Sequence, residues 1–198
     1  MKSFPHLTYA RAVVLFFSAL LCGVPGLLKA DEPVEASVRR LDDDANQAGR
    51  SKVASEIGNR FTNFAGSPAN ASALVTGLHD GTAITLTTTV NNQAATIEFQ
   101  PTSRQLGYGN IFIALALAQG SLAKAGIVQP TADQIVAALN GGAITGNDGG
   151  AIALTGVLTQ RAAGNGWADI AQSLGVNLGP VVQNLQAAHQ HIVTGSTQ

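Results

Sequence analysis

The sequence predicts an α+β fold, a mostly helical single domain that carries two short β-hairpins. Residues 108–126, YGNIFIALALAQGSLAKAG, are apolar on nearly every side of a helix, which is typical of a helix surrounded by protein or lipid. Gln119 ends the apolar run after about ten residues, which is too short to span a bilayer. Pairs of alternating, β-branched segments lie on both sides of this stretch, each pair around a turn signal. We therefore expect a central core helix with a hairpin before it and another after it.

Residues 1–30 have the three parts of a secretory signal peptide. Lys2 and Arg11 form the positive start, residues 12–24 form the apolar run, and Ala30 precedes the predicted cleavage site. The protein is therefore expected to be periplasmic or secreted, with no membrane span after cleavage.

Two alternatives to a cleaved signal peptide stay open. One is an uncleaved membrane anchor, and the other is a lipoprotein modified at Cys22, although Leu21 is larger than the residue that usually precedes such a cysteine. Cleavage after Ala30 would leave eight Lys and Arg against 12 Asp and Glu, and would remove the only cysteine. A chain without cysteine has no disulfide, no thiol nucleophile and no thiolate metal site.

Residues 31–50 are acidic and contain few apolar side chains, which predicts a flexible, solvated tether. Asp42, Asp43 and Asp44 could suggest calcium, but no loop of spaced ligands with a glycine follows them. Hydrated surface is the simpler interpretation of such a run. The globular domain is expected over residues 51–190.

Two helices are expected at the start of this domain. One face of the first would carry Val53, Ile57, Phe61 and Phe64. Gly66 is placed to end this helix, Ser67 to cap the second, Pro68 to take its first position, and Gly81 to stop it. Asn70 begins a glycosylation sequon, which matters only in a eukaryotic secretory pathway.

The first hairpin is expected over residues 84–99, where two alternating segments flank the turn pair Asn91-Asn92. The side chains expected on its buried face are Ile84, Leu86, Ile97 and Phe99. A loop over residues 101–107 then leads into the central helix, which Gly126 is placed to end in a left-handed conformation.

The order helix, hairpin, helix recurs after residue 126. Thr131 and Gln134 have the spacing of a capping box, and a second hairpin is expected over residues 143–154 around the turn signal at residues 147–150. Thr155 is placed to cap the helix that follows. The recurrence is explained either by an internal duplication or by chance, and the sequence leaves both open.

Residues 167–185 resemble a helix-turn-helix with its turn at Gly175. A protein that reads DNA must neutralise phosphates with Lys or Arg, and neither occurs after Arg161. We therefore expect a packing unit that binds no nucleic acid. Its two facing sets of side chains would be Trp167, Ile170 and Leu174 on one helix and Val181, Val182 and Leu185 on the next. Residues 191–198 are expected to form a flexible tail.

The sequence assigns no catalytic, cofactor-binding or metal-binding residue. His79-Asp80 could serve acid–base chemistry, but a polar helix end is the simpler interpretation. His189 and His191 are two residues apart, so they do not face each other on a helix and are expected in the solvated tail. Gly107-Tyr108-Gly109 lacks the third glycine of a dinucleotide fingerprint and predicts only a tight start to the central helix.

A set of short motifs covers most of the mature chain. They are Gly107-Tyr108-Gly109-Asn110 with the Ala/Leu helix, Pro130-Thr131 through Leu139-Asn140-Gly141-Gly142, Gly156-Val157-Leu158 through Arg161, Gly166-Trp167 with Ile170-Ala171 and Leu174-Gly175, and Leu178-Gly179-Pro180-Val181-Val182. With these motifs, residues 61–185 resemble a group of uncharacterised exported proteins of proteobacteria. The resemblance implies export, and it brings no activity, cofactor or catalytic residue.

The expected function is therefore that of an exported, non-enzymatic structural or partner-binding protein. Its partner would be an envelope or extracellular protein or a glycan. The alternative is a small envelope hydrolase or polysaccharide-active enzyme. A buried cluster of His79, Asp80 and Arg104 in one pocket would favour that alternative.

Overall fold

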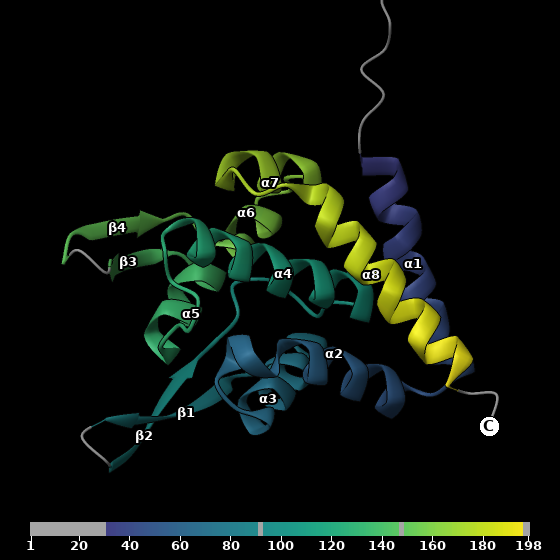
Figure 1. The fold of residues 1–198 in the computed structure, drawn as a ribbon, viewed down its shortest axis with the longest axis horizontal. Coiled ribbons are helices and arrows are strands. Elements are labelled where there is room, and N and C mark those ends of the chain that lie inside the picture. The colour runs from purple at the N-terminus through teal and green to yellow at the C-terminus, as the bar shows by residue number, and fades with distance from the viewer. Residues whose placement is uncertain (1–30, 91–92, 147–148, 196–198) are drawn as a thin grey trace, which may run out of the picture.

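Helix α4 (Tyr108–Lys124) runs through the middle of the molecule, with other helices packed around it (Figure 1). The computed structural model describes residues 31–90, 93–146 and 149–195, so the predicted signal peptide, the pair Asn91-Asn92 and the first half of the second turn lie outside the described residues. Within the described part, eight helices and four strands form the predicted α+β, mostly helical domain with two hairpins.

The elements follow one another without long connections. Besides α4, the helices are α1 (Asp31–Gln47), α2 (Arg50–Ala65), α3 (Pro68–Asp80), α5 (Ala132–Asn140), α6 (Val157–Ala162), α7 (Trp167–Leu174) and α8 (Leu178–Thr194), and the strands are β1 (Ile84–Val90), β2 (Gln93–Phe99), β3 (Gly142–Thr145) and β4 (Ala151–Leu154). Among the described helices, none combines the length and the apolar character needed to cross a bilayer.

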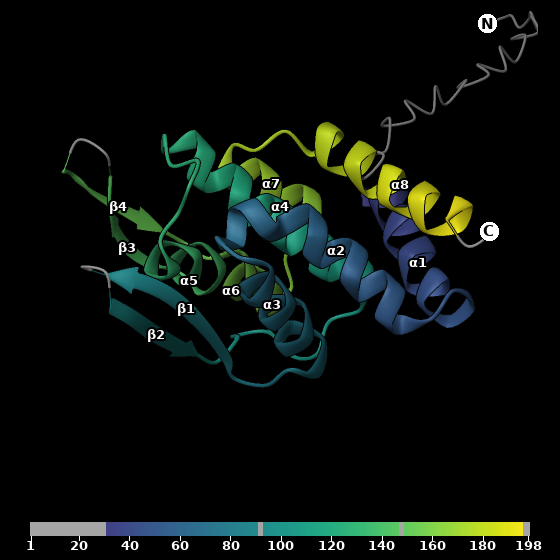
Figure 2. The same cartoon turned by 60° about the horizontal axis from the view of Figure 1, so that its bottom comes forward.

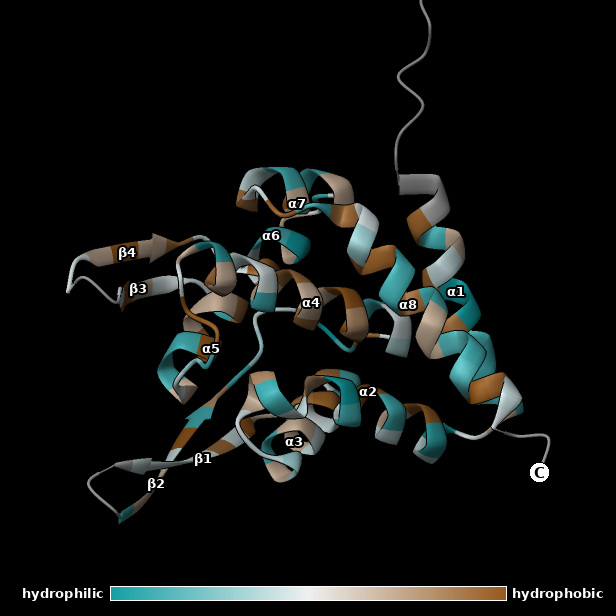
Figure 3. Cartoon of the chain, viewed as in Figure 1, coloured by the Kyte–Doolittle hydropathy of each residue, from teal (hydrophilic) through white to brown (hydrophobic). Residues whose placement is uncertain are grey.

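The burial of α4 on all sides confirms its predicted central position. Ile111, Ile113, Leu115 and Leu117 are each 0% exposed, although they point in different directions around the helix. In Figure 3 the middle of α4 is largely brown, whereas α1 and α8 alternate between brown and teal. Gly126 has φ +79° just beyond the helix, and Ile127 N donates to Leu122 O at 2.8 Å, so the predicted left-handed ending is confirmed.

The prediction of a flexible acidic tether over residues 31–50 is wrong. Residues 31–47 form α1, which packs on α4 and α8. Its apolar side chains Val34, Val38, Leu41 and Ala45 are spaced four, three and four residues apart, and all are buried. This stripe is narrow and charged residues surround it. The average composition of the segment therefore indicated a solvated tether, although its apolar residues have the spacing of an amphipathic helix.

The prediction of a flexible tail from residue 191 is also wrong for the described residues. Helix α8 continues to Thr194, and Ile192 is only 1% exposed. Lys52 Nζ donates to the backbone oxygen of Ile192 at 2.9 Å, which ties the end of α8 to α2. Residues 191–194 therefore belong to the helical body.

The predicted helix caps are confirmed with one exception. Ser67 Oγ accepts from Asn70 N, and Thr131 forms both bonds of its capping box with Gln134. Thr155 does not cap α6, because the N-cap is Gly156 at φ +74°. A side chain at Gly156 would overlap the backbone at the end of α5, so close approach of two chain segments decides this position.

Both hairpins project from the same side of the helical body (Figure 2). In the first, Ile84 pairs with Phe99 and Leu86 with Ile97, and these side chains form the buried face as predicted. In the second, Ile144 pairs with Ile152. The order helix, hairpin, helix thus occurs twice in space.

Residues 167–185, which resemble a helix-turn-helix, pack against other helices of the domain and not against each other as expected. Trp167 is 0% exposed, and its Nε1 donates to Asn110 Oδ1 on α4 at 3.0 Å. Gly175 has φ +63° and makes the predicted turn. Helix α8 then packs chiefly on α1, α4 and α2, so the expected face-to-face contact of α7 with α8 is wrong.

Candidate functional site

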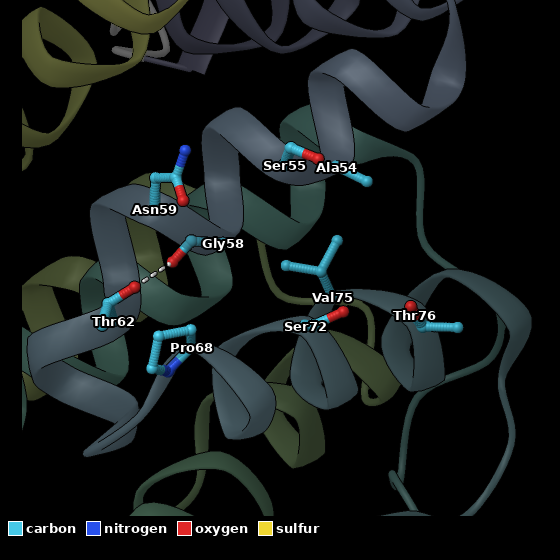
Figure 4. Close-up of a pocket in the computed structure, with 9 residues that line it drawn as sticks. All are labelled: Ala54, Ser55, Gly58, Asn59, Thr62, Pro68, Ser72, Val75 and Thr76. Carbon is cyan, nitrogen blue, oxygen red and sulfur yellow. Dashed lines mark hydrogen bonds between the residues drawn. The ribbon is translucent and has the colours of Figure 1, made fainter.

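A groove of about 160 Å³ lies between α2 and α3 on the surface of the molecule (Figure 4). It is lined by Ala54, Ser55, Gly58, Asn59, Thr62, Pro68, Ser72, Val75 and Thr76. The lining consists of small hydroxyl, amide and apolar groups, and no charged side chain belongs to it. Such a surface offers hydrogen bonds without a net charge.

Most polar side chains of this groove have no partner within the described protein. Thr62 Oγ1 donates to Gly58 O at 3.0 Å, which is the bond drawn in Figure 4. Ser55, Asn59 and Ser72 make no side-chain hydrogen bond to another described residue, and all three are exposed. Their donors and acceptors are therefore available to a ligand.

The groove has a fixed shape because α2 and α3 are tied together below it. Asn70 is 5% exposed, and its amide nitrogen donates both to Ala65 O at 2.9 Å and to Thr87 O at 2.8 Å. Its amide oxygen accepts from Thr87 N at 2.8 Å. One buried side chain thus joins the end of α2, the start of α3 and the outer edge of β1.

The same three hydrogen bonds show whether the glycosylation sequon at Asn70 is accessible in the folded protein. A glycan attached to Asn70 would need the amide nitrogen that both carbonyl groups already use. The folded protein therefore uses Asn70 as a structural residue, and the sequon is not accessible.

One end of the groove opens into a second hollow of about 280 Å³, which shares Ala54, Val75 and Thr76 with it. This hollow is also lined by Arg50, His79, Asp80 and Tyr108. The rings of His79 and Tyr108 are stacked, with centroids 4.4 Å apart and planes 14° from parallel. Aromatic and ionic side chains therefore lie at one end of the uncharged groove.

The ring of His79 is held in one orientation. Its Nδ1 lies 3.1 Å from Leu106 O, and because a carbonyl oxygen only accepts, Nδ1 carries the proton and donates. Burial raises the pKa of the Tyr108 phenol above its ordinary value. The phenol therefore stays protonated as a hydrogen-bond donor at neutral pH.

The start of α4 beside this hollow is capped by a residue from another helix. Gly107 offers no side chain, and Asp42 Oδ1 of α1 accepts instead from Gly109 N at 3.1 Å. Burial raises the pKa of Asp42, while backbone hydrogen bonds from Gly109 and Tyr108 lower it by less. A side chain at Gly109 would overlap the backbone of Val38, so the glycines of this motif allow α1 to approach.

The structure does not assemble His79, Asp80 and Arg104 into one pocket. His79 and Asp80 line the end of the α2–α3 groove, whereas Arg104 lines a different hollow together with Arg161. The cluster that would have favoured an enzyme is therefore not formed by these three residues.

Both C-terminal histidines pair with acids. His191 is exposed as expected, with 71% of its side chain accessible, whereas His189 is half-buried. His189 Nδ1 lies 2.7 Å from Asp44 Oδ2, and His191 Nδ1 lies 2.8 Å from Glu56 Oε2. Asp44 is 5% exposed, so the interpretation of the acidic run as hydrated surface is wrong at this position. No group of three or more His, Cys, Asp or Glu side chains placed to hold a metal ion occurs among the described residues.

Sequence reasoning missed the groove and the capping role of Asp42. The i, i+3 and i, i+4 spacing of polar side chains at Ser55, Asn59 and Thr62 was a signal for one polar helix face. The missing side chain at Gly107 was a signal that another segment must cap the central helix.

Compared with known proteins, the chain matches no protein-family model, no curated protein and no solved structure.

Proposed function

We propose that this protein is exported and binds an uncharged glycan segment in the groove between α2 and α3, without catalysing a reaction on it. The observation that carries the proposal is a set of exposed polar side chains in the groove, Ser55, Asn59 and Ser72, that make no side-chain hydrogen bond to another described residue. Glycans present many hydroxyl groups, and such side chains can bond hydroxyls both as donors and as acceptors.

The charge of the groove favours a neutral ligand. None of its nine lining residues is charged. Arg50 and Asp80, which line the adjoining hollow at its end, have opposite signs, as do Lys52 and Glu56, which line a hollow beside Ser55 and Asn59. A charged segment lying in the groove would lose hydration without gaining an ion pair along most of its length. A hydroxyl-rich chain would exchange its bonds to water for bonds to the groove.

The apolar content of the surface favours a glycan over a protein partner. Protein interfaces depend on a few large aromatic or aliphatic side chains that fill pockets. The exposed large apolar side chains of the described residues are Val128 and Val193, and neither lines the groove. The half-buried ring of His79, stacked on the buried ring of Tyr108, lies at its end, where a sugar ring could pack.

The proposal of export rests on residues 1–30 and on the resemblance to exported proteobacterial proteins. Helix α1 begins at Asp31, so cleavage after Ala30 would leave every described helix and strand in place. N-terminal sequencing of the protein from the producing cell tests this, and Asp31 is the expected first residue. A chain that keeps Met1 in the envelope fraction would contradict cleavage.

Glycan binding is tested by nuclear magnetic resonance of the isotopically labelled protein. We would titrate it with neutral oligosaccharides of glucose and of N-acetylglucosamine at two salt concentrations. Backbone amide shifts of Ser55, Asn59, Ser72 and Thr76 are expected to move together and to saturate. Because the groove carries no charge, affinity is expected to change little with salt.

Matched variants locate the binding. Asn59→Ala is expected to weaken it, because the amide loses its bonds to the ligand, whereas Asn63→Ala, an exposed asparagine one turn further on α2 that does not line the groove, is the control. If the oligosaccharide moves the amide shifts of Asn59→Ala and of Ser72→Ala as much as those of the parent, the proposed site is contradicted. Release of reducing ends from the oligosaccharide that is lost in His79→Gln would instead support the hydrolase alternative.

A further inference from the structure

A third hollow, of about 370 Å³, lies on another part of the surface and has a different chemical character from the groove. It is lined by Thr102, Ser103, Arg104, Gln105, Leu106, Arg161 and Ala162. Two of the eight Lys and Arg that follow residue 30 are in this lining, and no acidic residue is. Two cationic residues therefore line one hollow of a chain that has an excess of acids after residue 30.

Arg161 is held in place before any ligand arrives. Its Cζ lies 4.7 Å from the centroid of the Trp167 ring, and its Nη1 donates to Asn165 O at 3.0 Å. Glu35 is the acid nearest to it, at 4.0 Å from Nη2, and both side chains of this pair are about one-third exposed. A guanidinium has five N–H donors, so most donors of Arg161 remain without a hydrogen bond to a described residue.

Ser103 adds a hydroxyl that has no partner among the described residues. Its Oγ is buried, yet it makes no hydrogen bond to any described residue. Buried polar atoms are nearly always bonded in folded proteins, so this hydroxyl is a candidate donor to a group bound in the hollow that Ser103 lines. Arg104 is exposed and makes no hydrogen bond or ion pair with another described residue.

The loop that carries Ser103 and Arg104 is fixed at both ends. On one side, Asn140 Oδ1 accepts from Thr102 N at 3.2 Å, and Asn140 Nδ2 donates to Gln100 O at 2.7 Å. On the other side, Leu106 N donates to Leu78 O at 3.0 Å. These bonds therefore hold the backbone of Ser103 and Arg104 in place.

We propose that Ser103, Arg104 and Arg161 form an oxyanion-binding site that takes a carboxylate or a phosphate group of a small ligand. Guanidinium forks match the oxygen pairs of both groups, and the hydroxyl donates a further bond. This site is separate from the uncharged groove and does not rest on glycan binding there.

Trp167 provides the measurement, because it is the only tryptophan and it packs against Arg161. The purified protein is titrated with inorganic phosphate and, separately, with glucuronate, at constant ionic strength kept with sodium chloride. Saturable quenching or enhancement of the tryptophan fluorescence is expected with at least one of the two. The anion that saturates the fluorescence change at the lower concentration shows whether the site prefers a phosphate or a carboxylate group.

Variants make the test specific. Arg104→Gln is expected to weaken binding about tenfold or more, because it removes a charged donor, and Ser103→Ala roughly threefold to tenfold. Arg104 is exposed, so Arg104→Gln is expected to keep the parent's circular dichroism spectrum. Lys124→Gln removes a cation outside this hollow and is expected to leave the affinity unchanged.

Two results would overturn the proposal. The first is fluorescence that responds to phosphate and glucuronate no differently from chloride at the same ionic strength. The second is saturable binding of equal affinity in the parent, Arg104→Gln and Ser103→Ala, which would place the anion elsewhere.

Discussion

Helices α1 and α4 are both 17 residues long and pack against each other, yet their sequences have opposite character. α4 is apolar on nearly every side, whereas α1 carries charges around a stripe of four buried side chains. In both, the buried positions reach nearly complete burial, with Leu115 and Leu41 each 0% exposed. The comparison teaches that the spacing of apolar residues decides whether a helix joins the core, and the overall charge does not.

The largest loss is expected where α4 meets α7. Trp167→Ala removes a fully buried ring and its bond to Asn110, so the free energy of unfolding is expected to fall by about 3–5 kcal/mol. Urea unfolding followed by circular dichroism measures it. Val128→Ala, at a side chain 76% exposed, is the control and is expected to change the midpoint little. Equal midpoints for the two variants would show that this side of α4 is not a packed core.

The next prediction compares α1 and α4 directly. Leu115→Ala and Leu41→Ala are each expected to cost about 2–5 kcal/mol, because both side chains are completely buried. The same urea experiment gives both values. If only Leu115→Ala lowers the midpoint, α1 is the flexible tether that its composition suggested.

A smaller effect is expected at the glycine where the two helices touch. Gly109→Ala is expected to cost about 1–3 kcal/mol, because the new methyl group would overlap the backbone of Val38. Gly58→Ala is the matched control, since the nearest atom to its added methyl group is 4.0 Å away. That variant is expected to gain about 0.5–1 kcal/mol from helix propensity. A gain at both positions would contradict close packing of α1 on α4.

The smallest effect on stability is expected from Asp42, the residue of α1 whose carboxyl group caps the start of α4. Because burial raises the pKa of Asp42 above its ordinary value of 3.8, the folded chain binds this proton more tightly than the unfolded chain. The contribution of Asp42 to stability is therefore greatest below about pH 4 and declines as the pH rises through the folded pKa.

Asp42→Asn keeps an acceptor for Gly109 N and removes this dependence on pH. Relative to the parent, the variant is expected to become more stable as the pH rises from about 4 to 7, in urea unfolding of both chains at several pH values. A difference that moves the opposite way would show that the start of α4 favours the charged carboxylate more than burial opposes it.

The sequence predicted the elements whose signals are local. The Ser67 and Thr131 caps and the alternation of the first hairpin depend on residues a few positions apart, and the structure confirms them. The sites depend on contacts between distant segments, such as Asp42 with Gly109 or Arg161 with Trp167 and the loop at Arg104, which no local pattern encodes. Asn70 shows the same limit, because its sequon is local whereas its burial against β1 is not.

Deleting α1 tests most directly whether this helix belongs to the folded unit. Two chains would be compared by thermal unfolding, one from Asp31 to the C-terminus and one from Ser51. Deleting α1 uncovers α4 and removes the buried side chains of Val34, Val38 and Leu41, each worth about 1.5–3 kcal/mol, against a total stability of roughly 5–15 kcal/mol. The longer chain is expected to unfold cooperatively, and the shorter chain is expected to lose the transition or to melt far lower. Equal melting temperatures for the two chains would show that α1 is not part of the folded unit.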